Sequence, residues 1–164
     1  MDLIDLLGDP AYRHMLLNHF PIVGLAVAWL VLVIGLCLRQ SALMFTGLAL
    51  VALTAGASFP VAHYGDAAYP AIYDQLDGRG RDWLDYHAEL AESWLPLLYA
   101  NAALAALGLA AGALRRPLLF GAAILVALLT LGGIGGAVIV GKAGGRIQHP
   151  EFRLSDPPAS EARY

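Results

Sequence analysis

Four long apolar stretches alternate with polar segments along the chain, at residues 19–38, 41–63, 94–114 and 117–140. A helix rises about 1.5 Å per residue, so about 20 apolar residues are enough to cross a hydrocarbon core about 30 Å thick. The third stretch also has a polar helical lead-in that begins near Asp82. The pattern therefore predicts transmembrane helices at about residues 19–38, 41–63, 82–114 and 117–140.

Two of the three connections between these helices are very short. They are Arg39-Gln40 between the first and second helices and Arg115-Arg116 between the third and fourth. Short connections make successive helices antiparallel neighbours, so we expect an all-α, up-down-up-down four-helix bundle. This bundle forms a single domain, residues 1–150, and we expect residues 151–164 to be a mobile C-terminal tail.

The remaining connection, residues 64–93, is long and rich in turn-forming residues. Tyr69-Pro70 and the segment 77–80 are typical of turns. We expect short amphipathic pieces lying on the membrane surface here, and a further short interfacial helix at residues 3–7. Three glycines after Val140 are expected to end or loosen the fourth helix.

The composition supports a membrane protein and excludes several other classes. Hydrophobic residues make up 59% of the chain and charged residues only 14%, whereas soluble domains average about 25% charged residues. A net charge of −3 argues against a nucleic-acid partner, which requires a basic face. The single cysteine, Cys37, allows neither a disulfide framework nor a c-type haem attachment motif.

The distribution of charge predicts how the bundle is oriented. The two short turns contain Arg39, Arg115 and Arg116 and no acidic residue, and all 13 acidic residues lie towards the other end. Basic residues favour the cytoplasmic side. We therefore expect a multi-pass protein of the bacterial inner membrane with both termini on the outer, periplasmic side. Residues 1–12 contain no basic residue, so the first apolar stretch is expected to be a retained anchor rather than a secretory signal.

The five histidines all fall at the predicted outer end of the bundle: His14, His19, His63, His87 and His149. Counting from the short turns at about 1.5 Å per residue places His19, His63 and Glu92 at similar heights, roughly 28–33 Å, with His87 within about two turns of them. Separate helices thus bring imidazoles to one level near the outer surface.

Three interpretations of these histidines stay open. In the first, they lie among lipid headgroups and bind only water, lipid and loop carbonyls. In the second, a b-type haem has two axial imidazoles from diagonal helices, with His19 and His87 as the preferred pair and His63 and His149 as the reserve pair. In the third, a transition-metal ion such as copper, zinc or iron is held by ligands from separate helices: His19, His63, His87 and Glu92.

A glycine-rich segment, residues 132–136, lies in the outer half of the fourth helix. Its small residues would leave room for a macrocycle. Gly132 and Gly136 also have the GxxxG spacing that lets helices pack closely, within one chain or between the subunits of an oligomer.

The segment His14-x4-His19-Phe20-Pro21 at the start of the first membrane helix resembles the signature of a bacterial protein family. That family consists of small four-helix inner-membrane proteins of unassigned function, some of them fused to Rieske iron–sulfur domains. His87 and the glycine-rich fourth helix are similar to features of the same family. This chain differs in having Met15 where proline is usual and His63 at the end of the second helix. The resemblance implies a role in respiratory electron transfer.

These observations predict a membrane-anchored, b-type haem-binding electron-transfer protein, with haem b near the outer face. Its expected partners are the lipid bilayer, a quinol, a c-type cytochrome or a larger respiratory or photosynthetic complex. The alternatives are a non-catalytic accessory subunit of such a complex and a transition-metal-binding membrane protein. The sequence has no Ser/His/Asp triad and no phosphate loop, so an electron-transfer or accessory role is favoured over an enzymatic one.

Overall fold

The computed structural model describes residues 3–158 and folds them into helices, with no strand among them. The elements are α1 (Leu3–Gly8), α2 (Pro10–Leu17), the π-helical segment η1 (Phe20–Gly24), α3 (Leu25–Cys37), α4 (Ser41–Gly56), α5 (Ser58–Gln75), α6 (Gly78–Leu114), α7 (Arg116–Gln148) and the 3-10 turn η2 (Pro150–Phe152).

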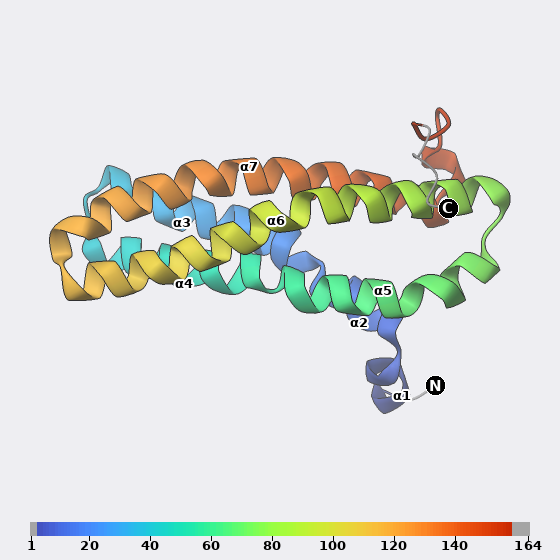
Figure 1. The fold of residues 1–164 in the computed structure, drawn as a ribbon, viewed down its shortest axis with the longest axis horizontal. Coiled ribbons are helices and arrows are strands. Elements are labelled where there is room, and N and C mark those ends of the chain that lie inside the picture. The colour runs from blue at the N-terminus through green and yellow to red at the C-terminus, as the bar shows by residue number, and fades with distance from the viewer. Residues whose placement is uncertain (1–2, 159–164) are drawn as a thin grey trace.

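Four helical spans run up and down the molecule and are joined by short turns (Figure 1). They comprise 28 to 37 residues each and are long and apolar enough to cross a membrane: Pro10–Cys37, Ser41–Gln75, Gly78–Leu114 and Arg116–Gln148. The predicted all-α class and the four apolar spans are confirmed. The first two spans form one antiparallel hairpin and the last two form another.

The prediction of a long surface loop at residues 64–93 is wrong. Helix α5 continues through Pro70 to Gln75, and α6 begins only three residues later at Gly78. The side chain of Asp77 caps α6 by accepting a hydrogen bond of 2.6 Å from the backbone N–H of Gly80. The helices persist because their apolar residues pack into a second core, made by Trp83, Leu84, Ala143 and Ile147 together with partly buried aromatic residues of α5 and α6.

The glycines after Val140 do not end the fourth helix, since α7 continues to Gln148. The chain then turns back, and the side chain of Arg153 is buried against the helix end, where it bonds the carbonyl oxygens of Arg146 and Ile147. Part of the predicted mobile tail is therefore anchored at Arg153. The rest of it, residues 159–164, lies outside the described residues.

The main core lies in the half of the bundle nearest the two short turns. Leucine, valine and alanine side chains from α3, α4, α6 and α7 fill it. Two polar contacts link its helices: Asn101 donates to the hydroxyl of Thr130 at 3.0 Å, and the indole of Trp29 donates to the carbonyl of Ala127 at 3.0 Å. The tight packing of this half fixes the positions from which the helices extend towards the termini.

The first hairpin changes direction in both of its arms. A π-helical turn that starts beside Pro21 separates α2 from α3, and Ala57 separates α4 from α5. Proline lacks a backbone N–H, and such a gap in the hydrogen-bond ladder is a common cause of helix bending. Beyond these breaks α2 packs against α5, while α6 packs against α7, and the two pairs diverge towards the end that carries the termini (Figure 1).

Candidate functional site

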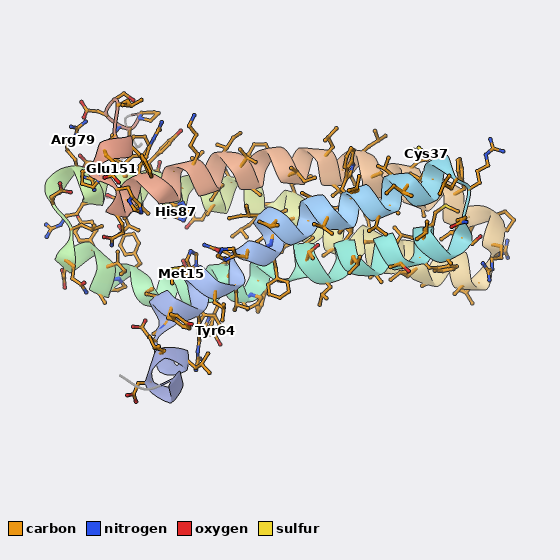
Figure 2. The ribbon with its side chains drawn as sticks, turned by 180° about the vertical axis from the view of Figure 1, so that it is seen from behind. Met15, Cys37, Tyr64, Arg79, His87 and Glu151 are labelled. Atoms are coloured by element: carbon orange, nitrogen blue, oxygen red, sulfur yellow. The ribbon has the colours of Figure 1, made fainter. Side chains whose placement is uncertain are left out.

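Two histidines meet between the diverging helix pairs. The ring of His14 on α2 and the ring of His87 on α6 have centroids 6.3 Å apart, and their planes are nearly perpendicular at 89°. Both residues are partly buried. Figure 2 shows His87 at the end of the bundle far from Cys37, which lies beside the short turns. The first and third spans thus bring two imidazoles together.

The orientation of His14 is set by the second arm of its own hairpin. Its Nδ1 atom lies 2.8 Å from the carbonyl oxygen of Val61 on α5. A carbonyl oxygen only accepts, so Nδ1 carries the proton and Nε2 of the neutral ring keeps a lone pair. The ring rests on Gly65, where an added Cβ would come within 2.9 Å of Nδ1. Glycine at this position is therefore required for the close approach.

The orientation of His87 is set in the same way by the second hairpin. Its Nδ1 atom lies 3.0 Å from the carbonyl oxygen of Val140 on α7. The ring rests on Gly144, where an added Cβ would lie 3.1 Å from Cε1 and 3.2 Å from Nδ1. The same arrangement occurs in both hairpins. A histidine on the first arm bonds the carbonyl oxygen of a valine on the second arm, and its ring lies on the glycine four residues after that valine, in a Val-x3-Gly segment.

The two hairpins share this register although their arms differ in length. His14 precedes Leu38 by 24 residues, whereas His87 precedes Leu114 by 27. On the returning arm, Val61 follows Ser41 by 20 residues, whereas Val140 follows Pro117 by 23. Both arms of the first hairpin are shorter by the same amount, so the contact between histidine and carbonyl is preserved.

Hydrogen-bond donors and cations occur on the helices that carry or contact the two histidines. Arg13, next to His14, donates to the hydroxyl of Tyr64 at 3.2 Å and lies over its ring. Trp83 precedes His87 by one helical turn and is 1% exposed, and its Nε1 is a buried donor without a partner among the described residues. The guanidinium of Arg146 lies 4.5 Å from the centre of the Trp83 ring. These groups suit an anionic ligand such as a carboxylate.

The other predicted ligands lie away from this pair. His19 is exposed, with Nδ1 3.0 Å from the carbonyl oxygen of Met15 in its own helix. His63 is exposed and its ring contacts Tyr64. His149 is exposed and lies 3.0 Å from the carboxylate of Glu151.

Neither predicted set of ligands is assembled as expected. Glu92 is exposed on α6, and the described residues contain no group of three or more His, Cys, Asp or Glu side chains placed to hold a metal ion. The structure brings His87 of the third span beside His14 of the first span, whereas the prediction paired His87 with His19.

Sequence reasoning left His14 out of the ligand pairs because it placed the start of the first membrane helix at His19. The helical span begins earlier, at Pro10, and the side chain of Asp9 caps it by accepting from the backbone N–H of Ala11 at 2.7 Å. Asp followed by Pro is a known signal for a helix start, so the sequence did contain the information that places His14 on a helix.

Comparison of the chain with protein-family models, curated proteins and solved structures finds no match. The resemblance to the four-helix family therefore rests on the residues quoted above, and the function is inferred from the geometry of the histidine pair.

Proposed function

We propose that the protein binds a b-type haem between His14 and His87 and transfers electrons through it. The distance between the two rings carries the proposal. Imidazole nitrogens bind metal ions at about 2.0–2.1 Å and lie about 1.1 Å from the ring centre, so two imidazoles on opposite sides of one ion have centroids about 6.3 Å apart. The observed separation is 6.3 Å.

The hydrogen bonds of the two rings support the same proposal. Histidines that bind metals usually donate their other ring N–H to a carbonyl or carboxylate, which fixes the tautomer and makes the ligating nitrogen more basic. His14 and His87 each bond a backbone carbonyl of the neighbouring helix through Nδ1. Each Nε2 is thereby left with the lone pair that a metal ligand needs.

The donors beside the histidines match the anionic edge of a haem. Haem b has two propionate groups, and bound carboxylates favour charge-assisted hydrogen bonds from arginine and from N–H donors. The unpartnered Nε1 of Trp83 and the guanidinium of Arg146 lie one helical turn beyond His87 and are suited to one propionate. Arg13, next to His14 in the sequence, already donates to the hydroxyl of Tyr64 and to the carbonyl oxygen of Leu7.

The charge distribution supports a location near the outer face of the bacterial inner membrane. The histidine pair lies at the end opposite the arginine-containing turns, and basic turns favour the cytoplasm. A site at that level is accessible to a quinol in the membrane or to a soluble c-type cytochrome, alone or within a larger respiratory or photosynthetic complex. A bound haem would supply one-electron chemistry, and His14 and His87 are the residues that would hold its iron.

The test is the visible spectrum of the purified protein before and after reduction with dithionite. We expect sharp reduced α and Soret bands in the wild-type protein and their loss in His14→Ala and in His87→Ala. His19→Ala and His63→Ala are the matched controls, since both remove an exposed imidazole from the same end of the bundle, and both should keep the bands.

Two outcomes would overturn the proposal. If the bands persist in His14→Ala and disappear in His19→Ala, haem is bound by a different pair. If the wild-type protein is colourless even after expression with added haem, the haem proposal fails. Metal analysis of that colourless protein then separates a bare copper, zinc or iron ion between the two imidazoles from an accessory subunit without a cofactor.

A further inference from the structure

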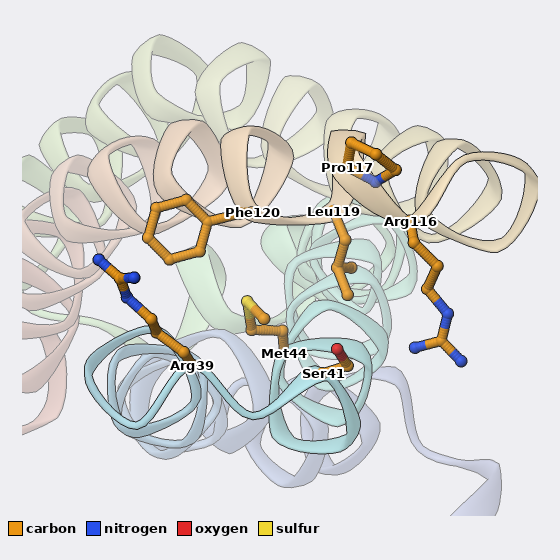
Figure 3. A pocket seen from close by; sticks show the side chains of 7 residues that line it. All are labelled: Arg39, Ser41, Met44, Arg116, Pro117, Leu119 and Phe120. Atoms are coloured by element: carbon orange, nitrogen blue, oxygen red, sulfur yellow. The ribbon is translucent and has the colours of Figure 1, made fainter.

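An open hollow of about 370 Å³ lies at the opposite end of the bundle, between the two short turns (Figure 3). Arg39 and Arg116 stand on opposite sides of it, and apolar side chains form its floor (Figure 3). The residues that line it are Arg39, Ser41, Met44, Arg116, Pro117, Leu119 and Phe120. Helices α4 and α7 both begin here, so the hollow combines positive charge with apolar surface.

The hollow results from the unequal length of the two hairpins. The turn of the second hairpin projects beyond the turn of the first (Figure 1), as the longer arms require. The first turn of α7 therefore extends past the end of α3 and the start of α4. Leu119 and Met44 close the floor, and Phe120 keeps 40% of its surface exposed at the edge.

Arg39 has an unfavourable backbone conformation for its residue type. Its φ angle is +51°, the left-handed region, and among the described residues it is the non-glycine residue found there. It ends α3 in a Schellman arrangement, with the backbone N–H of Gln40 bonding the carbonyl of Gly35 at 3.0 Å. Glycine is the usual residue at this position because it adopts a positive φ without steric cost. An arginine here holds the turn at a steric cost, and its side chain lines the hollow.

The arginines of this end have no acidic residue near them in the sequence. The segments 10–65 and 93–150 contain no Asp or Glu. Arg116 lies over the ring of Phe45 at 5.4 Å and has no acidic partner in these segments. The first backbone N–H groups of α4 and α7 also lack side-chain caps, since neither Gln40 nor Arg115 makes a capping hydrogen bond. Pro117 has no backbone N–H and the N–H of Leu118 donates to the carbonyl oxygen of Arg115, so the positive charge at the hollow comes from the side chains of Arg39 and Arg116 on its two sides.

We propose that this hollow binds the phosphate group of an anionic phospholipid. Arg39 and Arg116 contact the phosphate oxygens, and the first acyl carbons lie against Met44, Leu119 and Phe120. Basic pockets at the ends of membrane helices are suited to such headgroups. The position of the hollow at the end of four membrane-spanning helices places it at headgroup level, which favours a lipid over a free phosphate ion. The proposal does not depend on the haem.

The test measures lipid preference with the full-length protein in nanodiscs of phosphatidylcholine, with and without phosphatidylglycerol. Native mass spectrometry should show phosphatidylglycerol retained on the wild-type protein, and thermal unfolding should occur at a higher temperature when it is present. Each arginine near an anionic headgroup contributes about fivefold to affinity, so Arg39→Gly and Arg116→Gln should each lower retention by about that factor. Arg115→Gln, next to the hollow but outside its lining, should retain the lipid.

Arg39→Gly should also have two opposing effects on the unfolding temperature, one in each lipid mixture. In phosphatidylcholine alone it should raise the unfolding temperature, because glycine relieves the left-handed conformation, while the extra stabilisation by phosphatidylglycerol disappears. If Arg115→Gln loses as much phosphatidylglycerol as Arg39→Gly and Arg116→Gln do, lipid retention depends only on the net charge of this end, and the proposal is overturned. An equal stabilisation by millimolar inorganic phosphate in phosphatidylcholine would identify a free-phosphate site and overturn it as well.

Discussion

The two hairpins of this protein share one arrangement of histidine and glycine but differ in the helices that form it. Each places a histidine of its first arm on a Val-x3-Gly segment of its second arm. The second hairpin does this with two unbroken helices, α6 and α7, whereas the first uses helices interrupted by η1 and by Ala57. Its arms are also shorter by the same number of residues on both sides.

The difference shows which features of a hairpin the site requires. Equal shortening of both arms keeps the histidine in register with its carbonyl, so arm length is free to vary. The interruptions allow α2 and α5 to leave the bundle axis, and this divergence makes room between the hairpins where the imidazoles of His14 and His87 meet. The mismatch in length at the other end creates the hollow between the turns.

The hairpins also differ in how closely their arms approach. In the first, a Cβ added at Gly47 would lie 2.6 Å from the Cα of Leu32, which is backbone. In the second, a Cβ added at Gly108 would meet side chains and no backbone: Ala122 at 3.1 Å and Leu48 of α4 at 3.6 Å. Gly47→Ala should therefore destabilise the protein by about 2 kcal/mol, because overpacking against backbone forces the helices apart.

Gly108→Ala is the matched variant for this comparison. Its loss should be below about 1 kcal/mol, because the gain in helix propensity offsets a small displacement. Unfolding in mixed detergent micelles at increasing SDS gives both values. If the two variants have the same free energy of unfolding, the closer approach of the helices in the first hairpin does not affect stability.

The glycines under the two histidines provide a second comparison. An added Cβ would lie 2.9 Å from the His14 ring at Gly65 but 3.1 Å from the His87 ring at Gly144. If haem lies between these rings, Gly65→Ala should displace its imidazole further and weaken haem retention by about tenfold, with a smaller effect for Gly144→Ala. The reduced spectrum during titration with haem measures both. Gly145→Ala, where an added Cβ meets nothing within 4 Å, should match the wild-type protein, and a reversed order at positions 65 and 144 would contradict the assigned geometry.

Most of the fold could be predicted from the sequence because apolar length and short turns determine a four-helix bundle almost completely. The ends of the helices could not. Pro70 and Gly144 are typical of turns and helix ends, yet both lie inside helices, since a tertiary aromatic core and a close histidine contact outweigh their local preference. For the same reason the first helix was predicted to begin at residue 19, which left His14 outside it. Counting residues from the turns placed His87 at the correct end of the bundle.

A buried polar pair distinguishes the cores of the two hairpins. In the second, Asn101 and Thr130 are fully buried and bonded to each other. At the corresponding level of the first, Thr54 faces Gly24 and its hydroxyl donates only to its own helix, to the carbonyl of Leu50 at 2.8 Å. Asn101→Ala should cost about 1 kcal/mol in unfolding free energy, which is typical of polar contacts between membrane helices. Thr54→Ala is the control and should cost less; a larger loss there would make the first hairpin the one held by polar contacts.

The smallest expected effect concerns the contact that joins the start of the second hairpin to the C-terminal segment. The carboxylate of Asp77 accepts hydrogen bonds from the backbone N–H of Gly80 and from the guanidinium of Arg153, the latter at 2.9 Å. These contacts, the Gly80 N–H first, lower the pKa of Asp77 below its ordinary value of 3.8. A lowered carboxyl pKa means that the contact stabilises the folded segment above pH of about 4 and is lost as the pH falls through the lower folded value.

The protection factor of residues 150–158, which corrects the exchange rate for the intrinsic pH dependence of amide exchange, should therefore be high at neutral pH and fall only below pH of about 4. In Asp77→Asn the protection factor should already be lower at neutral pH and nearly independent of pH, because the neutral amide bonds Arg153 weakly. The ion pair between Arg79 and Asp156 is exposed on both sides, so Asp156→Asn should leave the profile unchanged. If Asp156→Asn speeds exchange as much as Asp77→Asn does, the segment is held by surface charge and the buried guanidinium of Arg153 is not its anchor.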